Sequence, residues 1–400
     1  MTEAAPRAAI RVAVALLALS LAAVALNALV PAFGALVGPP ETGGIDLQSR
    51  AAEVSRLWSG QSPYGLGNAS SSAVYPPASY VMLTPLAWLP YEILKWLWAG
   101  SAVGCLLWLG WLAGRVAGAR GPEQVALAGF VPASIAGVAY GVQNGQLHVH
   151  VVAALVGAAL LLLRSRPSLR SDLLGGVLLL FALVKPTVAG PFCLLLLARR
   201  DRVPVLVGLT AAYCVLTAVG GLVTGEGLQI LTDWLHRARG GASFGAGGSY
   251  GNVHAWSAML GLSRFDPVAT VIVVAGVVGF AFSGRAARAV DGERWGALAV
   301  VALGARVAVY HQDYDDTLLI GVQLALLARW GRGRSLTVVW VLGALVLVQL
   351  GPREWLNLGG AAPSLLEWAR LGVWAVALAM CVQAGGSSGY PEASGGVDEV

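Results

Sequence analysis

Long apolar runs recur along this chain, and they constrain its fold more than any other feature. Runs of about 15 to 25 residues with few charges follow one another from residue 8 onward, the length at which an α-helix crosses the hydrocarbon core of a bilayer. Apolar residues make up 57% of the 400 residues and the mean hydropathy is +0.70, a balance that soluble domains do not reach. The sequence therefore predicts an all-α fold, a polytopic transmembrane helical bundle.

Arginines gather in the short turns between the apolar runs, and the positive-inside bias places such turns in the cytoplasm. The basic turns hold Arg7 and Arg11, Arg115 and Arg120, Arg164, Arg166 and Arg170, Arg199, Arg200 and Arg202, Arg285, Arg288 and Arg294, and Arg329, Arg332 and Arg334. We then expect about twelve crossings with both termini cytoplasmic. The predicted spans are 8–30, one within 76–113, 124–141, 147–163, 172–184, 187–198, 203–224, 266–284, 295–310, 314–330, 336–351 and 368–384.

This topology predicts a single transmembrane domain over residues 1–384. Two large loops, 31–75 and 225–265, fall on the extracytoplasmic side together with several short polar turns. Residues 385–400 are small, polar and acidic, a composition typical of a disordered tail. The short apolar pieces within 172–198 fit either a hairpin of two short helices or one kinked helix.

Composition also excludes several classes of function. The four cysteines lie in apolar runs without a CxxC spacing, so we expect neither a disulfide framework nor a zinc site. The net charge of +5 comes from arginines in the turns, so no nucleic-acid partner is implied.

Asp46 is the first candidate functional residue. It lies at the start of a predicted interfacial helix in which Leu47, Ala51, Val54 and Leu57 share one apolar face. Its carboxylate could cap that helix by accepting a backbone N–H bond. A carboxylate at the water-facing mouth of a membrane cavity could also act as a general base. Both interpretations stay open on local sequence.

Lys185 interrupts an apolar run beside the helix-breaking Pro186, and it is one of two lysines in the chain. A cation at membrane depth is costly and needs a partner, and at a broken helix it suits an anionic lipid phosphate. The alternative is that the lysine extends to the membrane interface.

Two further polar islands carry candidate ligands. Asn144 and Gln146 offer amides in a Gly-bounded turn, followed by two histidines whose i, i+2 spacing does not favour a metal pair. The densest island runs from Tyr310 to Asp316 and follows an intramembrane Arg306. Its three acids and His311 could bind a divalent cation, or they could form a solvated turn or a polar pocket wall.

The loop 225–265 combines an apolar helical face, made by Leu228, Leu231, Trp234 and Leu235, with a Gly-rich stretch that ends in YGNVHAW. Such a loop can be a lid over a site, or it can be slack chain.

The order of these motifs resembles the GT-C superfamily of membrane glycosyltransferases. The motifs are Asp46 opening an amphipathic helix, GQSPYG, YPPASYVMLTPLAWLP, GVQNGQ, LVKPTVAGP, YGNVHAW and HQDYDDTLL, over about residues 8 to 330. The chain is most similar to the bacterial branch of polyprenyl-phosphate-mannose-dependent α-mannosyltransferases, to which an arabinofuranosyltransferase is related. The resemblance implies a plasma-membrane enzyme of GT-C type that takes a sugar from a polyprenyl phosphate, adds it to an extracytoplasmic glycolipid or glycan, and inverts the anomeric carbon.

By position, Asp46 matches the family's acidic base, Lys185 its lysine-proline break, and His311 its histidine that faces the donor phosphate. In this scheme Asp46 deprotonates the acceptor hydroxyl, while Lys185 and His311, with Arg306, stabilise the departing phosphate. Tyr75, Asn144 and Gln146 are candidates for holding the sugar, and Asn252 and His254 for the acceptor. No metal or other cofactor is needed.

The sequence departs from the family where Leu47, Gln48, Ser49 and Arg50 replace an aromatic-rich pattern after the acid. That departure leaves the acceptor open, and the donated sugar could be mannose or arabinofuranose. Lys185 and Arg306 at broken helices would also suit a transporter or flippase of an anionic lipid, although no internal repeat is visible. A scaffold in an envelope assembly is the third possibility.

Overall fold

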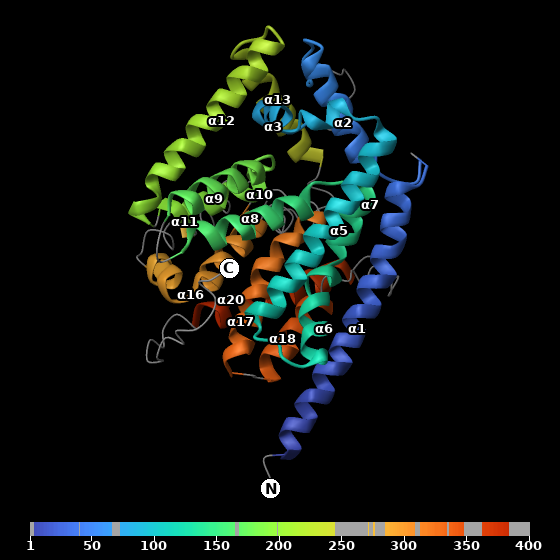
Figure 1. The fold of residues 1–400 in the computed structure, drawn as a ribbon, viewed down its shortest axis with the longest axis vertical. Helices are drawn as coiled ribbons and strands as arrows, with labels where there is room; N and C mark the ends of the chain where they lie inside the picture. The colour runs from blue at the N-terminus through green and yellow to red at the C-terminus, as the bar shows by residue number, and fades with distance from the viewer. Residues whose placement is uncertain are drawn as a thin grey trace.

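The computed structural model describes residues 4–39, 41–65, 73–164, 168–197, 199–244, 271, 275–276, 285–308, 313–333, 336–347 and 362–383. Every regular element in these ranges is a helix (Figure 1). The all-α prediction is therefore confirmed.

Within the described ranges, three helices are long and apolar enough to cross a membrane. They are α1 (Ala4–Val37), α5 (Tyr91–Val116) and α12 (Val203–Val223). Other apolar helices are shorter, among them α8 (His148–Leu162) and the segment Pro186–Leu197. The described residues thus support a membrane protein, and the number of crossings stays a prediction.

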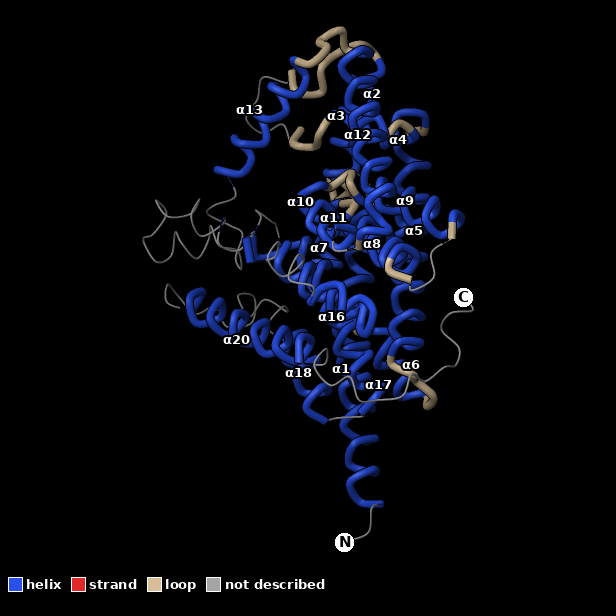
Figure 2. Tube along the Cα trace, turned by 90° about the vertical axis from the view of Figure 1, so that its left-hand side faces the viewer, coloured by secondary structure: helices blue, strands red, loops and turns tan. Residues whose placement is uncertain are grey.

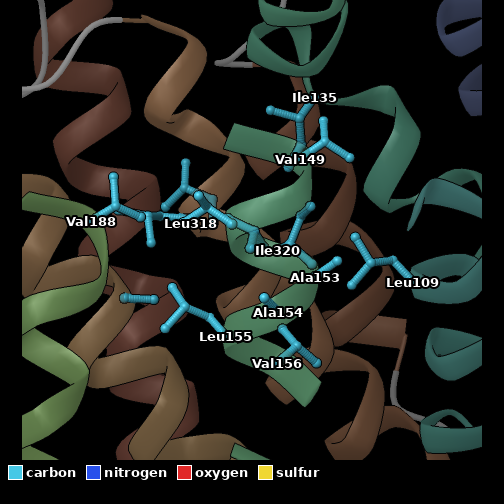
Figure 3. Packing of buried hydrophobic residues seen from close by; sticks show 14 of the residues in the cluster. Leu109, Ile135, Val149, Ala153, Ala154, Leu155, Val156, Val188, Leu318 and Ile320 are labelled. Atoms are coloured by element: carbon cyan, nitrogen blue, oxygen red, sulfur yellow. The ribbon is translucent and has the colours of Figure 1, made fainter. Parts of the chain in front are cut away.

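The centre of the bundle is built around α8, which is buried along most of its length (Figure 3). Inside a membrane, helices associate through close packing of small residues, because lipid tails are as apolar as leucine. At Gly175 of α9 (Leu169–Ala182), a Cβ would lie 2.6 Å from the Leu162 side chain. Glycine at this position therefore lets α9 approach the end of α8 closely.

The predicted span 124–141 is wrong as a single helix. The chain forms α6 (Pro122–Phe130), the short 3₁₀ helix η1 (Pro132–Ser134) and α7 (Ala136–Asn144). Pro132 has no N–H to continue the first helix. The carbonyl of Val131 at this break accepts bonds from Ser134 Oγ at 2.8 Å and from Gln323 Nε2 at 3.2 Å. Side chains thus support a carbonyl whose backbone partner, the Ser134 N–H, lies at 3.4 Å.

The break predicted at Lys185 is confirmed. Helix α9 ends at Ala182 and α10 (Pro186–Ala189) begins at the proline. Besides α12 and α13 (Gln229–Phe244), the described elements that follow α10 are η2 (Gly190–Phe192), α11 (Cys193–Leu197), η3 (Arg200–Arg202), α16 (Arg285–Ala308), η6 (Asp313–Leu319), α17 (Ile320–Gly333), α18 (Leu336–Leu347) and α20 (Ala362–Gln383). Most of the predicted span 266–284 lies outside the described residues.

Several short helices gather at one end of the molecule. They are α2 (Ile45–Trp58), α3 (Pro77–Met82), α4 (Pro85–Trp88) and α13 (Gln229–Phe244). Figures 1 and 2 show α2, α3 and α13 at the end opposite the first turns of α1. The helix predicted at Asp46 and the apolar helical face in loop 225–265 are both present.

Candidate active site

The turn from α1 to α2 contacts the turn from α7 to α8 almost backbone to backbone. The Gly44 N–H donates to the Gln143 carbonyl at 2.8 Å. Gly44 and Gly145 have φ values of 72° and 71°, which favour glycine, and a Cβ at Gly145 would lie 2.6 Å from Leu47 Cβ. Glycine therefore brings the first turn of α2 against the start of α8.

Asp46 lies in that first turn and does not cap the helix. The N-cap position is Gly44, and no side chain bonds to the free N–H groups there. The half-buried carboxylate instead accepts a bond at Oδ2 from Gln146 Nε2 at 2.7 Å. The capping interpretation is thus not supported, and the carboxylate is held by a residue 100 positions away.

Tyr75 completes this cluster from the segment that precedes α3. Its hydroxyl donates to Gln146 Oε1 at 3.3 Å, so the Gln146 amide has one partner at each end. Trp234 and Arg237 of α13 donate to the carbonyls of Val74 at 3.0 Å and Tyr64 at 3.1 Å. The first and second large loops therefore meet beside Tyr75.

Lys185 has the partner that its burial requires. Its Nζ lies 3.0 Å from Asp315 Oδ1 of η6, and both side chains are more than nine-tenths buried. Ser79 of α3 donates to the Val184 carbonyl at 2.9 Å, which ties the helix break to the segment that carries Tyr75. The break thus presents a neutralised cation close to the first loop.

The two clusters act electrostatically on the same tyrosine. Burial raises the pKa of Tyr75, the positive charges of Lys185 and Arg50 oppose this rise, and the negative charges of Asp46 and Asp315 add to it. Tyr75 is therefore within the electrostatic range of the Asp46 cluster and of the Lys185–Asp315 pair, and these residues form one polar site.

Arg306 is arranged differently from Lys185. Its side chain is fully buried, its Nε lies 2.5 Å from Asp316 Oδ1, and its guanidinium lies 5.7 Å from the centre of the Trp374 ring. Asp315 and Asp316 thus pair with two cations from different parts of the chain. Among the residues that the structure describes, no three potential ligands gather in a metal-binding group.

Asn144 and His148, which flank Gln146 in the chain, make different kinds of contact. Asn144 Nδ2 donates to the Tyr140 carbonyl one turn earlier at 3.1 Å, a bond within its own helix. His148 packs so closely on Gly141 that a Cβ there would lie 1.8 Å from its Cε1. His148 also interacts electrostatically with Lys185 and Asp315, which places it near the site, although from the sequence it was considered only as part of a metal pair.

Arg50 is a second residue that the sequence did not single out. It lies one turn after Asp46 on α2, is buried, and contacts Glu53, Tyr75 and Tyr80. Its i, i+4 spacing from Asp46 was the available signal, because that spacing puts both residues on one face of a helix. The predicted residues His311, Asn252 and His254 lie outside the described part of the chain.

A comparison with known protein families gives a match to the model described as "Glycosyltransferase family 87", over residues 73–310. The match covers Tyr75, Asn144, Gln146, Lys185 and Arg306, whereas Asp46 precedes it and His311 follows it by one position. No curated protein and no solved structure matches the chain.

Proposed function

Because the chain belongs to glycosyltransferase family 87, a GT-C-type family of membrane glycosyltransferases, we propose that it transfers mannose from polyprenyl-phosphate-mannose. The acceptor in this proposal is a glycolipid or glycan on the extracytoplasmic side, and the anomeric carbon is inverted. A lipid-linked donor suits a site in which a cation is buried among membrane helices.

The observation that carries the proposal is the environment of Asp46. Gln146 Nε2 donates to Oδ2 at 2.7 Å, so this oxygen of the carboxylate is held in place. Oδ1 is then the oxygen that takes the proton of an acceptor hydroxyl as this hydroxyl attacks C1 of the sugar. Asp46 is the general base of the proposed reaction.

Lys185 is proposed to stabilise the departing phosphate. Asp315 holds its ammonium group at the helix break, with Nζ 3.0 Å from Oδ1. In a site of low dielectric, a cation stabilises developing negative charge more strongly than in water. His311 is proposed to contact the same phosphate, and Arg306 contributes through Asp316 by holding η6, which carries the partner of Lys185.

Tyr75, Asn144 and Gln146 are the proposed residues on the sugar side, and Asn252 and His254 are the proposed residues on the acceptor side. Because both ends of the Gln146 amide are already bonded, Gln146 acts on the sugar chiefly by holding Asp46 and Tyr75. The α13 contacts with the first loop support the assignment of loop 225–265 to the acceptor.

The helix ends support an extracytoplasmic site. Lys95 of α5 donates to the Gly38 carbonyl at the end of α1, so α1 and α5 run in opposite directions. Arg11 near the start of α1, Arg115 in the last turn of α5 and Arg202 before α12 are then at the ends away from α2 and α13. The positive-inside rule puts these ends in the cytoplasm.

The test is mannose transfer by purified protein in detergent, comparing the wild type with Asp46→Asn. Removal of a general base should lower kcat by about a hundredfold or more. Asp201→Asn is the matched control, because Asp201 pairs with Arg199 after α11 and is outside the site. Equal rates for the wild type and Asp46→Asn would remove Asp46 from the chemistry.

The same assay separates the alternatives. Transfer from polyprenyl-phosphate-arabinofuranose, with none from the mannose donor, would change the sugar and keep the reaction. Detergent solution holds no gradient, so any transfer there also separates an enzyme from a lipid transporter.

A further inference from the structure

Arg50 is buried one turn after the proposed base and is engaged on three sides. Its Nη1 lies 2.6 Å from Glu53 Oε2 and donates to the Tyr80 hydroxyl at 3.4 Å. Its guanidinium stacks on the Tyr75 ring, with Cζ 4.8 Å from the ring centre. Arg50 is 5% exposed, so these contacts take the place of water around its guanidinium.

Such an arrangement is a poor way to stabilise a fold. Taking two charges out of water costs about as much as their attraction returns, and well-packed apolar residues often replace a buried ion pair without loss. The planar guanidinium is well suited to a different task, because it can stack on an aromatic ring and bond in its own plane at the same time. The geometry thus favours orientation over stability.

The object that Arg50 orients is Tyr75. Arg50 stacks on its ring, and the Tyr80 ring lies 6.3 Å away, tilted by 30°. The fixed ring directs its hydroxyl to Gln146 Oε1, and an amide whose oxygen accepts this bond presents its N–H to Asp46 Oδ2. A chain of contacts therefore runs from Arg50 through Tyr75 and Gln146 to Asp46.

We propose that Arg50 is a positioning residue for the transfer reaction, which sets the orientation of the Asp46 carboxylate through Tyr75 and Gln146. The proposal rests on the proposed function. Arg50 itself makes no contact with the substrate; its guanidinium fixes the tyrosine, and the tyrosine selects the orientation of the amide that holds the base.

The test is a double-mutant cycle of Arg50→Lys and Tyr75→Phe, measured as kcat and as KM for the lipid donor. Lysine keeps the charge beside Glu53 but loses the planar stacking. Because small errors in the placement of a catalytic group are costly, each single change should lower kcat about tenfold, and Arg50→Lys should leave KM within about twofold. The double variant should be no slower than the slower single variant, because both changes break the same chain of contacts.

Several results would overturn the proposal. An additive cycle, with about a hundredfold loss in the double variant, would make the two residues independent. A raised KM with unchanged kcat would make Arg50 a donor contact. A wild-type kcat for Arg50→Lys would leave Arg50 without a role in orientation. Arg199→Lys, the same change in an ion pair outside the site, is the control and should keep the wild-type rate.

A second variant tests the proposal if Arg50→Lys does not fold. Arg50→Met combined with Glu53→Leu leaves no buried charge without a partner and should retain the wild-type melting temperature within a few degrees. It should show the same tenfold loss of kcat, and failure of this variant to fold as well would assign Arg50 to the fold. A wild type inactive with every lipid-linked sugar would overturn the proposed function, whereas an active wild type with unaffected Arg50 variants would overturn only this inference.

Discussion

At the scale of single residues, the amide of Gln146 links Tyr75 to Asp46, the proposed base. One end accepts from Tyr75 and the other donates to the carboxylate, so the group is an orienting device with a defined direction. A substitution that keeps the shape of Gln146 but changes its charge tests this role directly.

Gln146→Glu places a second carboxylate against Asp46. Two carboxylates in contact share one proton, so the pair holds that proton to higher pH than a lone acid does. We expect kcat at neutral pH to fall about tenfold or more, with activity recovering as the pH rises. The measurement is the pH profile of kcat. Gln146→Leu, which adds no charge, should lower kcat without moving the acidic limb, and superimposable profiles for all three proteins would contradict the assignment.

Lys185 allows stability and activity to be separated. Lys185→Met leaves Asp315 buried without its cation, which should cost about 3–5 kcal/mol of unfolding free energy. Lys185→Met with Asp315→Leu removes both charges and should recover most of the melting temperature, while transfer stays lost because the phosphate has no cation. Recovery of transfer in this double variant, measured beside thermal melting in detergent, would exclude a phosphate role for Lys185.

At the scale of the elements, two turns and two helix breaks assemble the site. Helix η6 is a 3₁₀ helix, in which successive residues lie about 120° apart around the axis. Asp315 and Asp316 therefore face different neighbours, one the break at Lys185 and the other Arg306 of α16. The contact between the α1–α2 turn and the α7–α8 turn then sets where α2 lies relative to Gln146.

Gly145→Ala tests that contact. The new Cβ would lie 2.6 Å from Leu47 Cβ in a left-handed backbone conformation, which should cost about 1–3 kcal/mol and displace Asp46 from Gln146. We expect a lower melting temperature and a loss of transfer. Gly100→Ala in α5 is the control, because a Cβ at Gly100 meets nothing within 4 Å. Unchanged transfer in Gly145→Ala would show that the turns need not touch.

At the scale of the whole molecule, orientation in the membrane is the property to test. Two single-cysteine variants, Gln61→Cys and Ala119→Cys, are made in a chain from which the four native cysteines have been removed. Gln61 lies in the exposed turn after α2, and Ala119 lies between α5 and α6. A membrane-impermeant maleimide added to intact cells should label only Gln61→Cys, with Ala119→Cys reacting after permeabilisation. The reverse pattern would place the site in the cytoplasm.

Hydropathy was enough to predict the helical class, and Pro186 was enough to predict the break at Lys185. The pairing of Lys185 with Asp315 was not predictable, because 130 residues separate them and any of three neighbouring acids could have been the partner. The split of 124–141 was missed because its apolar composition outweighed Pro132. Arg50 was missed because a charge on an amphipathic helix normally faces solvent.

The glycine contact between the two turns limits insertions in the turns as well as substitutions. Besides requiring glycine, each turn requires a fixed length. Two peptide units separate Gly44 from Asp46, and one separates Gly145 from Gln146. An inserted residue in either interval would rotate the helix start and carry the carboxylate or the amide out of reach. Spacing is therefore as much a requirement of the proposed site as the identity of Asp46.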